Sequence, residues 1–297
     1  MICRKPFGSG VMKFGCGQCT PCRVNRRRLW VHRLLLESMK HGNSAFIGLS
    51  YDDRHLPVDQ SVNPRHLQLF LKRIRERVAP SRLRFFGIGE YGERTQRPHY
   101  HVILFGLLSC LRGRTEHRIA RCCAQCDLVR SAWGKGSVDL GEVNKDSASY
   151  ITGYVQKKLT KHDDPRLKGR YPEFARMSNR PGIGANSMLD VAAVLHGELV
   201  DDDVPAQLRH GGKLMPLGRY LRRKLREAYG MSEVGTPKEV LAKVSEEMLL
   251  LHEERVALEI SKGKKIDHAY RALIDERLQK CLNIEAKVNI WSKKGAL

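Results

Sequence analysis

The sequence lacks any run of about 20 apolar residues, the length that a membrane-spanning helix requires. It also lacks an N-terminal basic stretch followed by an apolar one, which is the pattern of a secretion signal. A third absence is the phosphate loop Gly-x-x-x-x-Gly-Lys-Ser/Thr, which argues against a fused helicase. We therefore expect a cytoplasmic protein that has no membrane partner.

Acidic residues are scarce, because 32 Asp and Glu stand against 53 Lys and Arg, for a formal net charge of +21 over 297 residues. A charge of this size predicts a polyanionic partner. The basic residues gather at 26–28, 222–224 and 262–265. Clusters follow phosphates better than scattered charge does, so we favour nucleic acid over the alternative of a merely basic protein.

The nine cysteines are odd in number, which fits a reducing compartment better than a disulfide scaffold. Cys16, Cys19 and Cys22 have a spacing typical of zinc ligands, and Cys3 is the nearest candidate for the fourth ligand that tetrahedral zinc needs. An iron–sulfur cluster or buried free thiols are the alternatives.

A second cysteine cluster comprises Cys122, Cys123 and Cys126. These thiols either complete the first zinc site or form a site of their own. We assign none of the cysteines to catalysis.

Two histidines, His99 and His101, flank Tyr100 at the head of an apolar strand over residues 98–105. Side chains alternate along a strand, so both imidazoles point to one face, where they can share a divalent metal. The alternative is that they only make hydrogen bonds. A preceding strand over residues 85–90 and the turn residues at 92–98 predict a hairpin that brings Glu90 beside them.

Tyr150 and Tyr154 are four residues apart, which on a helix is one face, and Lys157 and Lys158 follow about one turn later. We expect Asp146 or Ser147 to cap this helix. Packing is the alternative role of the tyrosines. A metal, a phenol and an amine together suggest phosphoryl chemistry.

The predicted elements alternate in a specific order. A helix over 23–40 precedes a strand over 45–51, and a helix capped by Asn63 with Pro64 at its first position follows. Strands over 83–91 and 99–106, a short helix over 126–133, a strand over 137–143 and the tyrosine helix complete the series. This order predicts an α+β fold of the ferredoxin-like split β-α-β type, with a four- or five-stranded antiparallel sheet and the histidine strand at its centre. A non-cutting RNA-binding sheet of the same topology is the alternative.

Four stretches carry a family resemblance: residues 16–23 with Arg27 and Trp30, residues 46–53 with Leu56 and Pro57, residues 89–101, and residues 150–158. In this order and spacing they resemble rolling-circle replication initiators of the HUH endonuclease superfamily. Within it they are most similar to the replication proteins of gokushovirus-type microviruses, which are small single-stranded DNA phages. The resemblance covers about residues 3–162. One departure is Gly48, in a strand that is more often threonine-rich in the family.

The resemblance implies a metal-dependent DNA nickase and ligase. A tyrosine attacks the single-stranded origin, leaving a 5′ phosphotyrosine and a free 3′ hydroxyl, and the enzyme later rejoins the DNA. Tyr154 with Lys157 matches the family's Tyr-x-x-Lys pattern and is the first candidate nucleophile. Tyr150 is either a second nucleophile or a stacking residue. Lys157 would contact phosphate or stabilise the phenolate, with Lys158 as its substitute.

The implied cofactor is Mg²⁺ or Mn²⁺, held by His99, His101 and Glu90, with Glu93 as the runner-up to Glu90. The implied partners are the single-stranded DNA origin and the host helicase and polymerase, in the bacterial cytoplasm if a phage encodes the protein. Arg26, Arg27, Arg28 and Lys158 are the candidate DNA contacts.

The chain divides on this basis into an HUH endonuclease domain with its Cys-rich segment (1–165), a loop-rich basic connection (166–235) and a helical region (236–297). A capping box at residues 236–239 is expected to open that last region. The rival functions are a relaxase, a transposase or a plasmid initiator, and, from another class, a non-enzymatic nucleic-acid-binding protein with structural zinc.

Overall fold

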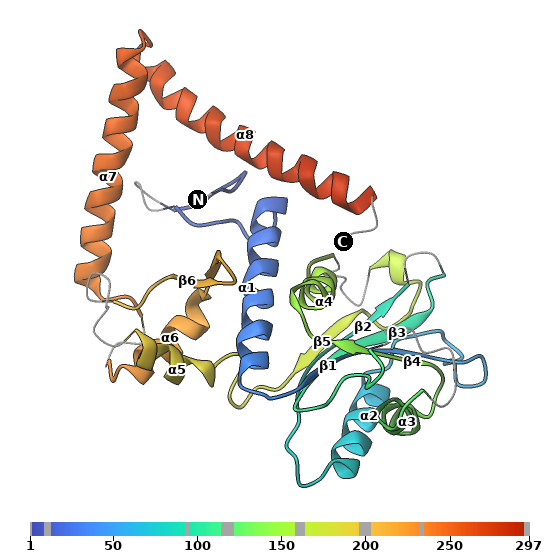
Figure 1. The fold of residues 1–297 in the computed structure, drawn as a ribbon. Coiled ribbons are helices and arrows are strands. Elements are labelled where there is room, and N and C mark those ends of the chain that lie inside the picture. Colours follow the sequence, from blue (N-terminus) through green and yellow to red (C-terminus); the bar gives the residue numbers. More distant parts are fainter. Residues whose placement is uncertain are drawn as a thin grey trace. The chain divides into compact units, whose positions relative to one another are not determined.

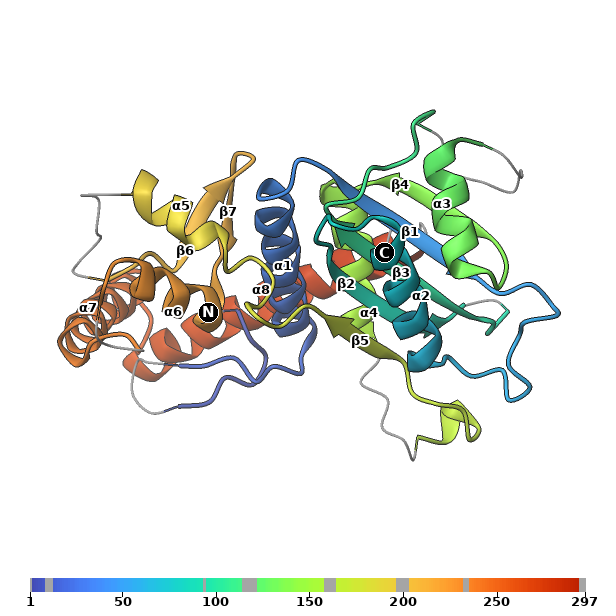
Figure 2. The ribbon, with the colours of Figure 1, turned by 90° about the horizontal axis from the view of Figure 1, so that it is seen from below.

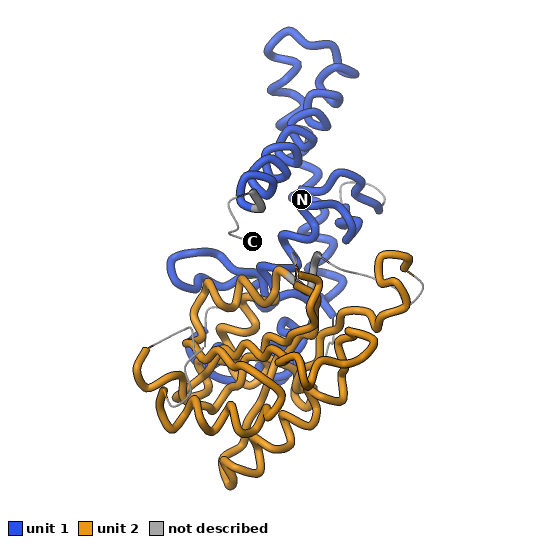
Figure 3. Tube along the Cα trace, turned by 90° about the vertical axis from the view of Figure 1, so that its right-hand side faces the viewer, with its two compact units in different colours: residues 1–29, 189–297 blue, residues 30–188 orange. Residues whose placement is uncertain are grey.

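A computed structural model describes residues 2–8, 13–92, 95–113, 122–157, 164–195, 203–231 and 235–293, without the side chains of residues 154–157, 292 and 293. The chain forms two compact units, residues 30–188 and residues 1–29 together with 189–297 (Figure 3). Among the described residues, no helix has the length and apolar character to cross a membrane. The three-part division of the chain stays a prediction.

The elements follow one another along the chain as labelled in Figure 1. In order they are α1 (Thr20–Met39), β1 (Ser44–Ser50), α2 (Pro64–Arg77), β2 (Arg84–Tyr91), β3 (Pro98–Phe105), α3 (Ala124–Trp133), β4 (Val138–Glu142), α4 (Lys145–Lys157), η1 (Pro165–Leu167), β5 (Phe174–Met177), α5 (Ser187–Val194), β6 (Gln207–His210), β7 (Lys213–Pro216), α6 (Gly218–Ala228), α7 (Lys238–Ser261) and α8 (Ile266–Lys293).

Five antiparallel strands form the sheet of the unit over residues 30–188, in the order β4-β1-β3-β2-β5. The first four strands have the order of the split β-α-β fold, because α2 connects β1 to β2 and α3 connects β3 to β4. The predicted α+β class is confirmed, and the histidine strand β3 is central. The segment expected to be loop-rich, residues 166–235, also contributes β5 to the edge of this sheet.

Helices α2 and α3 cover one face of the sheet and form its hydrophobic core (Figure 1, Figure 2). Alternate residues of β1, β3 and β4 point into this core, as expected for strands with one buried face. They are Ala45, Ile47, Leu49, Tyr100, Val102, Leu104, Val138 and Leu140. Helix α2 begins as predicted, with the Asn63 side chain accepting a hydrogen bond from the backbone N–H of Arg65 at 2.9 Å.

Tyr100, the residue between the two histidines, ties β3 to this core. Its hydroxyl lies 2.6 Å from the hydroxyl of buried Tyr51 and accepts a hydrogen bond from the backbone N–H of Asn63 at 2.8 Å. Burial raises the pKa of Tyr100 above its ordinary value, so the phenol stays protonated. The central strand is thereby joined to the end of β1 and to the start of α2.

The second half of α1 packs on the opposite face of the sheet through two contacts. The ring of Trp30 lies 5.4 Å from that of Phe86 on β2. The buried carboxylate of Glu37 accepts hydrogen bonds from Arg84 on β2 and, at 2.6 Å, from the backbone N–H of Gly184. A buried carboxylate requires such donors, so Glu37 anchors the helix on the sheet.

Two predicted helix caps are wrong. Helix α4 is capped by Asn144, whose Oδ1 accepts from the backbone N–H groups of Asp146 and Ser147 at 2.9 Å each. Ser147 is the third helical residue and accepts in return from the Asn144 N–H, which makes a capping box one step earlier than predicted. Thr236 does not cap α7, because its hydroxyl accepts from the buried guanidinium of Arg226 at 3.0 Å.

Replacing Tyr100 with Phe should lower the free energy of unfolding by about 1–3 kcal/mol, because the Asn63 N–H and the Tyr51 hydroxyl lose a buried partner. Urea unfolding followed by tryptophan fluorescence measures this change. Tyr270→Phe is the matched control, since Tyr270 is an exposed phenol on α8. Equal stability of both variants would show that the Tyr100 hydroxyl does not hold β3 in place.

Candidate functional site

Glu90, His99 and His101 come together on the sheet face opposite to the core. The β2–β3 register pairs Glu90 directly with His99, and His101 follows two residues along the same face. Glu90 Oε1 lies 2.8 Å from His99 Nε2 and 3.1 Å from His101 Nε2. One carboxylate oxygen therefore faces both imidazoles.

Burial controls the charges of this triad. Glu90 is only 2% exposed, and burial alone would raise its pKa, but hydrogen bonds and charge from His101 and His99 hold the pKa of Glu90 below its ordinary value. Burial lowers the pKa of His101. At neutral pH the site thus offers an ionised carboxylate and a neutral imidazole, which are the forms that ligate metals.

The three side chains fit a divalent cation. Their ligand atoms all lie within 4.8 Å of one another. Within the part of the chain that the structure describes, Glu90 Oε2 is buried without a hydrogen-bond partner, so this oxygen is available to a cation. Two imidazoles and a carboxylate form a donor set that suits a first-row divalent metal.

Helix α4 places Tyr150 against the triad. The Tyr150 ring meets the ring of His101 edge-on, with centroids 5.1 Å apart, and lies 6.1 Å from the ring of Phe46 on β1. Phe46 in turn stacks on His101 at 5.7 Å. Tyr150 is 38% exposed, so it contacts the triad and solvent at once.

Several predicted site residues lie outside the described part of the chain. They are the side chains of Tyr154 and Lys157 and the whole of Glu93 and Lys158. The backbone of α4 includes position 154, which lies one helical turn beyond Tyr150. The roles predicted for these four residues stay predictions.

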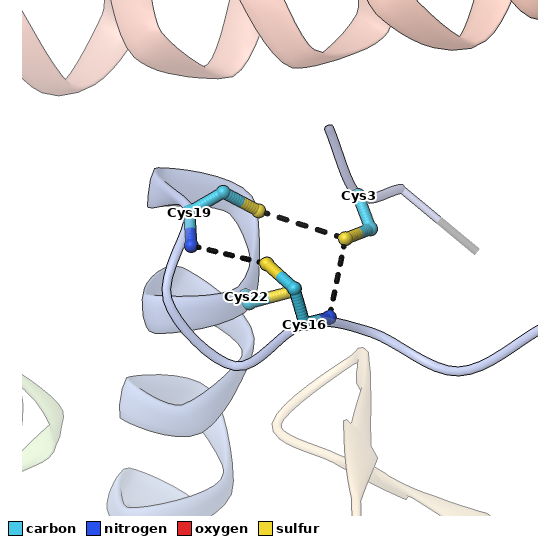
Figure 4. Close-up of side chains that lie close together, drawn as sticks. All are labelled: Cys3, Cys16, Cys19 and Cys22. Carbon is cyan, nitrogen blue, oxygen red and sulfur yellow. Dashed lines mark hydrogen bonds between the residues drawn. The ribbon is translucent and has the colours of Figure 1, made fainter. Parts of the chain in front are cut away.

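The first cysteine cluster also comes together, in the unit that contains residues 1–29 (Figure 4). The four thiols of Cys3, Cys16, Cys19 and Cys22 lie within 4.8 Å of one another, with 3.8 Å between the Sγ atoms of Cys19 and Cys3. Backbone hydrogen bonds from Cys19 and Gln18 lower the pKa of Cys16 to about 6. The cluster is compatible with a bound metal, and Cys3 occupies the predicted fourth position.

Comparison with known proteins supplies the family context. Residues 44–159, which hold all of the triad and Tyr150, match the model of a family of phage proteins described as replication-associated protein ORF2. The replication-associated protein VP4 of Bdellovibrio phage phiMH2K is 33% identical over 161 residues, which are 51% of this chain and 50% of the relative. The resemblance to microvirus replication proteins is confirmed.

Two further relatives are replication-associated proteins of phages. ORF2 of Spiroplasma virus 4 is 29% identical over 221 residues, 71% of this chain and 67% of the relative. ORF4 of Chlamydia phage 1 is 30% identical over 157 residues, 48% of this chain and 38% of the relative. The chain thus spans about half the length of the Bdellovibrio phage relative and less of the Chlamydia phage one. No solved structure matches.

The structure explains the one departure from the microvirus replication proteins, Gly48. In the sheet Gly48 pairs with His101 on one side and with Asp139 of β4 on the other. A Cβ at position 48 would lie 3.2 Å from Asp139 Oδ2, so the glycine leaves room for that carboxylate. The Asp139 charge raises the pKa of His101, against the larger effect of burial. Asp139 therefore acts on the metal triad electrostatically.

Sequence reasoning missed Asp139 and the role of Phe46. Both occupy positions in the predicted strands that alternate with buried residues, and this alternation was the available signal. Their approach to His101 depends on the pairing of β1 with β3 and β4, which no local pattern specifies.

Part of the predicted DNA-contacting charge is engaged within the unit that contains residues 1–29. Arg26 and Arg27 are half-buried, and burial lowers the pKa of Arg27. Arg28 is exposed and donates a hydrogen bond to the carbonyl of Leu214 on β7 at 2.6 Å. Arg28 therefore also holds the loop end of the β6–β7 hairpin against α1.

The basic cluster over residues 222–224 is likewise paired. Arg222 lies 2.6 Å from the buried carboxylate of Asp203, which also accepts two hydrogen bonds at 2.7 Å from Arg226. Lys224 lies 2.6 Å from Glu227. This cluster contributes more to the fold of its unit than the sequence pattern indicates.

Replacing Glu90 with Gln should weaken Mn²⁺ binding by at least about tenfold, because changes even outside the first ligand shell commonly cost that much. Isothermal titration of the full chain with Mn²⁺ measures the affinity. The control is Glu142→Gln, which removes the same charge at an exposed position at the end of β4. Unchanged Mn²⁺ affinity in Glu90→Gln would exclude Glu90 as a ligand.

Proposed function

We propose that this chain starts rolling-circle replication by nicking single-stranded DNA at the origin and later rejoining it. The observation that carries the proposal is the contact of a helical tyrosine, Tyr150, with the Glu90–His99–His101 triad. A phenol beside a divalent-metal site is the arrangement that tyrosine attack on a phosphodiester needs. The similarity to phage replication-associated proteins supports the same function.

A Mg²⁺ or Mn²⁺ ion held by Glu90, His99 and His101 would polarise the scissile phosphate. The tyrosine oxygen attacks the phosphorus and the bond from phosphorus to the 3′ oxygen breaks. The phenol loses one proton and the departing 3′ oxygen gains one. One phosphodiester is exchanged for a 5′ phosphotyrosine ester, so rejoining requires no ATP.

Tyr154 is the proposed first nucleophile, on its match to the Tyr-x-x-Lys pattern. A free phenol has a pKa of about 10, so the attacking oxygen needs a nearby cation, and we assign this role to Lys157, with Lys158 as its substitute. Tyr150 is proposed to accept the second strand or to stack on a base of the bound DNA. Mapping the attached residue separates these two roles.

The excess positive charge supports DNA as the substrate. Arg26, Arg27, Arg28 and Lys158 are the proposed phosphate contacts. The free 3′ hydroxyl is the end that a host polymerase extends, and a host helicase would unwind the duplex ahead of it. A structural zinc held by Cys3, Cys16, Cys19 and Cys22 would stabilise the segment that precedes the arginines.

The experiment is to incubate the full chain with Mn²⁺ and single-stranded DNA from its own replicon and to measure the covalent protein–DNA adduct on a denaturing gel. We expect an adduct for the wild type and at least a hundredfold loss in Tyr154→Phe, because the variant lacks the attacking oxygen. DNA affinity should stay within about twofold, since electrostatic contacts dominate it.

Tyr270→Phe is the control and should form the wild-type amount of adduct. Peptide mass spectrometry then maps the attachment, and a second adduct at Tyr150 would assign it as a nucleophile. If the wild type binds this DNA tightly but forms no adduct with either Mn²⁺ or Mg²⁺, the nickase proposal fails and a non-enzymatic DNA-binding protein is the better conclusion.

A further inference from the structure

A second set of four thiols lies in the unit over residues 30–188. Cys122, Cys123 and Cys126 surround the start of α3, and Cys110 reaches them from the segment after β3. The Sγ atom of Cys110 lies 3.7 Å from that of Cys122 and 4.0 Å from that of Cys123. All four sulfur atoms lie within 4.8 Å of one another.

We propose that Cys110, Cys122, Cys123 and Cys126 form a second tetrathiolate metal site, of the class that holds zinc. Four sulfur atoms bound tetrahedrally at about 2.3 Å from zinc lie about 3.8 Å apart. The two measured separations bracket this value. Cys110 is the ligand that the sequence pattern did not identify, because eleven residues separate it from Cys122.

Local hydrogen bonds prepare this site for thiolates. The Cys123 thiol accepts backbone hydrogen bonds from Cys126 and Leu111. Cys123 is also the residue that precedes the first turn of α3, where it makes no side-chain capping bond. The start of a helix favours negative charge, and backbone N–H groups that point at sulfur stabilise a metal-bound thiolate.

Burial separates a metal site from four packed thiols. Cys110, Cys122 and Cys126 are buried in the hydrophobic core beside Val129 and Trp133. Single buried thiols pack there as small apolar groups. Four sulfur atoms that converge on one point, with backbone donors aimed at one of them, fit a shared cation, because the cation offsets the cost of burying negative charge.

The site would be structural. Helix α3 carries Trp133, whose Nε1 donates a hydrogen bond to the carbonyl of Ser50 at 2.9 Å and whose ring lies 5.5 Å from that of Tyr100. A metal at the start of α3 therefore stabilises the helix that packs behind the histidine strand. It also joins the two ends of a segment, residues 111–121, that contains four arginines.

The two thiol clusters should bind metal independently, since each is complete within its own unit. Cobalt titration of the reduced, metal-free full chain counts thiolate-bound metal through the thiolate-to-cobalt absorption. We expect two equivalents in the wild type and one in the double variant Cys110→Ser with Cys123→Ser. The double variant Cys16→Ser with Cys22→Ser should also bind one.

Two controls isolate the thiolate signal. Cys281→Ser should keep both equivalents, because Cys281 is the cysteine that belongs to neither cluster. His99→Ala with His101→Ala should leave the thiolate absorption unchanged. If the Cys16→Ser and Cys22→Ser variant binds no thiolate-held cobalt, the proposal of a second site is wrong.

Alkylation of the wild type tests the same site without relying on a variant that may not fold. The zinc-loaded chain is treated with iodoacetamide before and after a strong chelator, and the modified peptides are mapped by mass spectrometry. We expect Cys110, Cys122, Cys123 and Cys126 to react at least tenfold faster after chelation. Equal rates, or a disulfide between any two of them in the freshly reduced chain, would overturn the proposal.

Discussion

The Glu90 carboxylate lies between the imidazoles of His99 and His101, and the arrangement of the whole site depends on this contact. A buried carboxylate must be paired, and these imidazoles face it because the β2–β3 register aligns Glu90 with His99. A slip of one residue would turn the Glu90 side chain to the core face, beside Tyr100, where an unpaired charge could not be accommodated. The pairing that stabilises the hairpin is thus also the pairing that assembles the ligands.

The central strand separates two tasks onto its two faces. On one face Tyr100 and its neighbours hold α2 and the end of β1 through buried hydrogen bonds. On the other face the histidines meet Tyr150 and Phe46 and remain partly open to solvent. Because the structural contacts occupy the core face, the chemical face can carry a buried carboxylate and a glycine at position 48 that packing alone would not favour.

Charge and thiol chemistry follow the same division between fold and function. The clusters at 222–224 and 262–265 make internal ion pairs, with Asp203 and Glu259 among their partners, so clustering by itself overstates the surface available to DNA. The net charge of +21 still far exceeds these pairs and supports a polyanionic substrate. Each unit also contains four converging thiols, which can stabilise it without enlarging its hydrophobic core.

Features that depend on neighbours along the chain could be predicted from the amino-acid sequence. Strand alternation placed His99 and His101 on one face, and Asn63 with Pro64 marked the start of α2, because both effects act within a few residues. Folding was needed to settle the contacts that strand pairing and chain closure create. The approach of Tyr150 to His101, the space that Gly48 leaves for Asp139, and the addition of Cys110 to the second thiol cluster each join segments that no local pattern connects. Even the cap of α4 shifted to Asn144, because several adjacent polar residues could cap equally well and only the end of β4 selects among them.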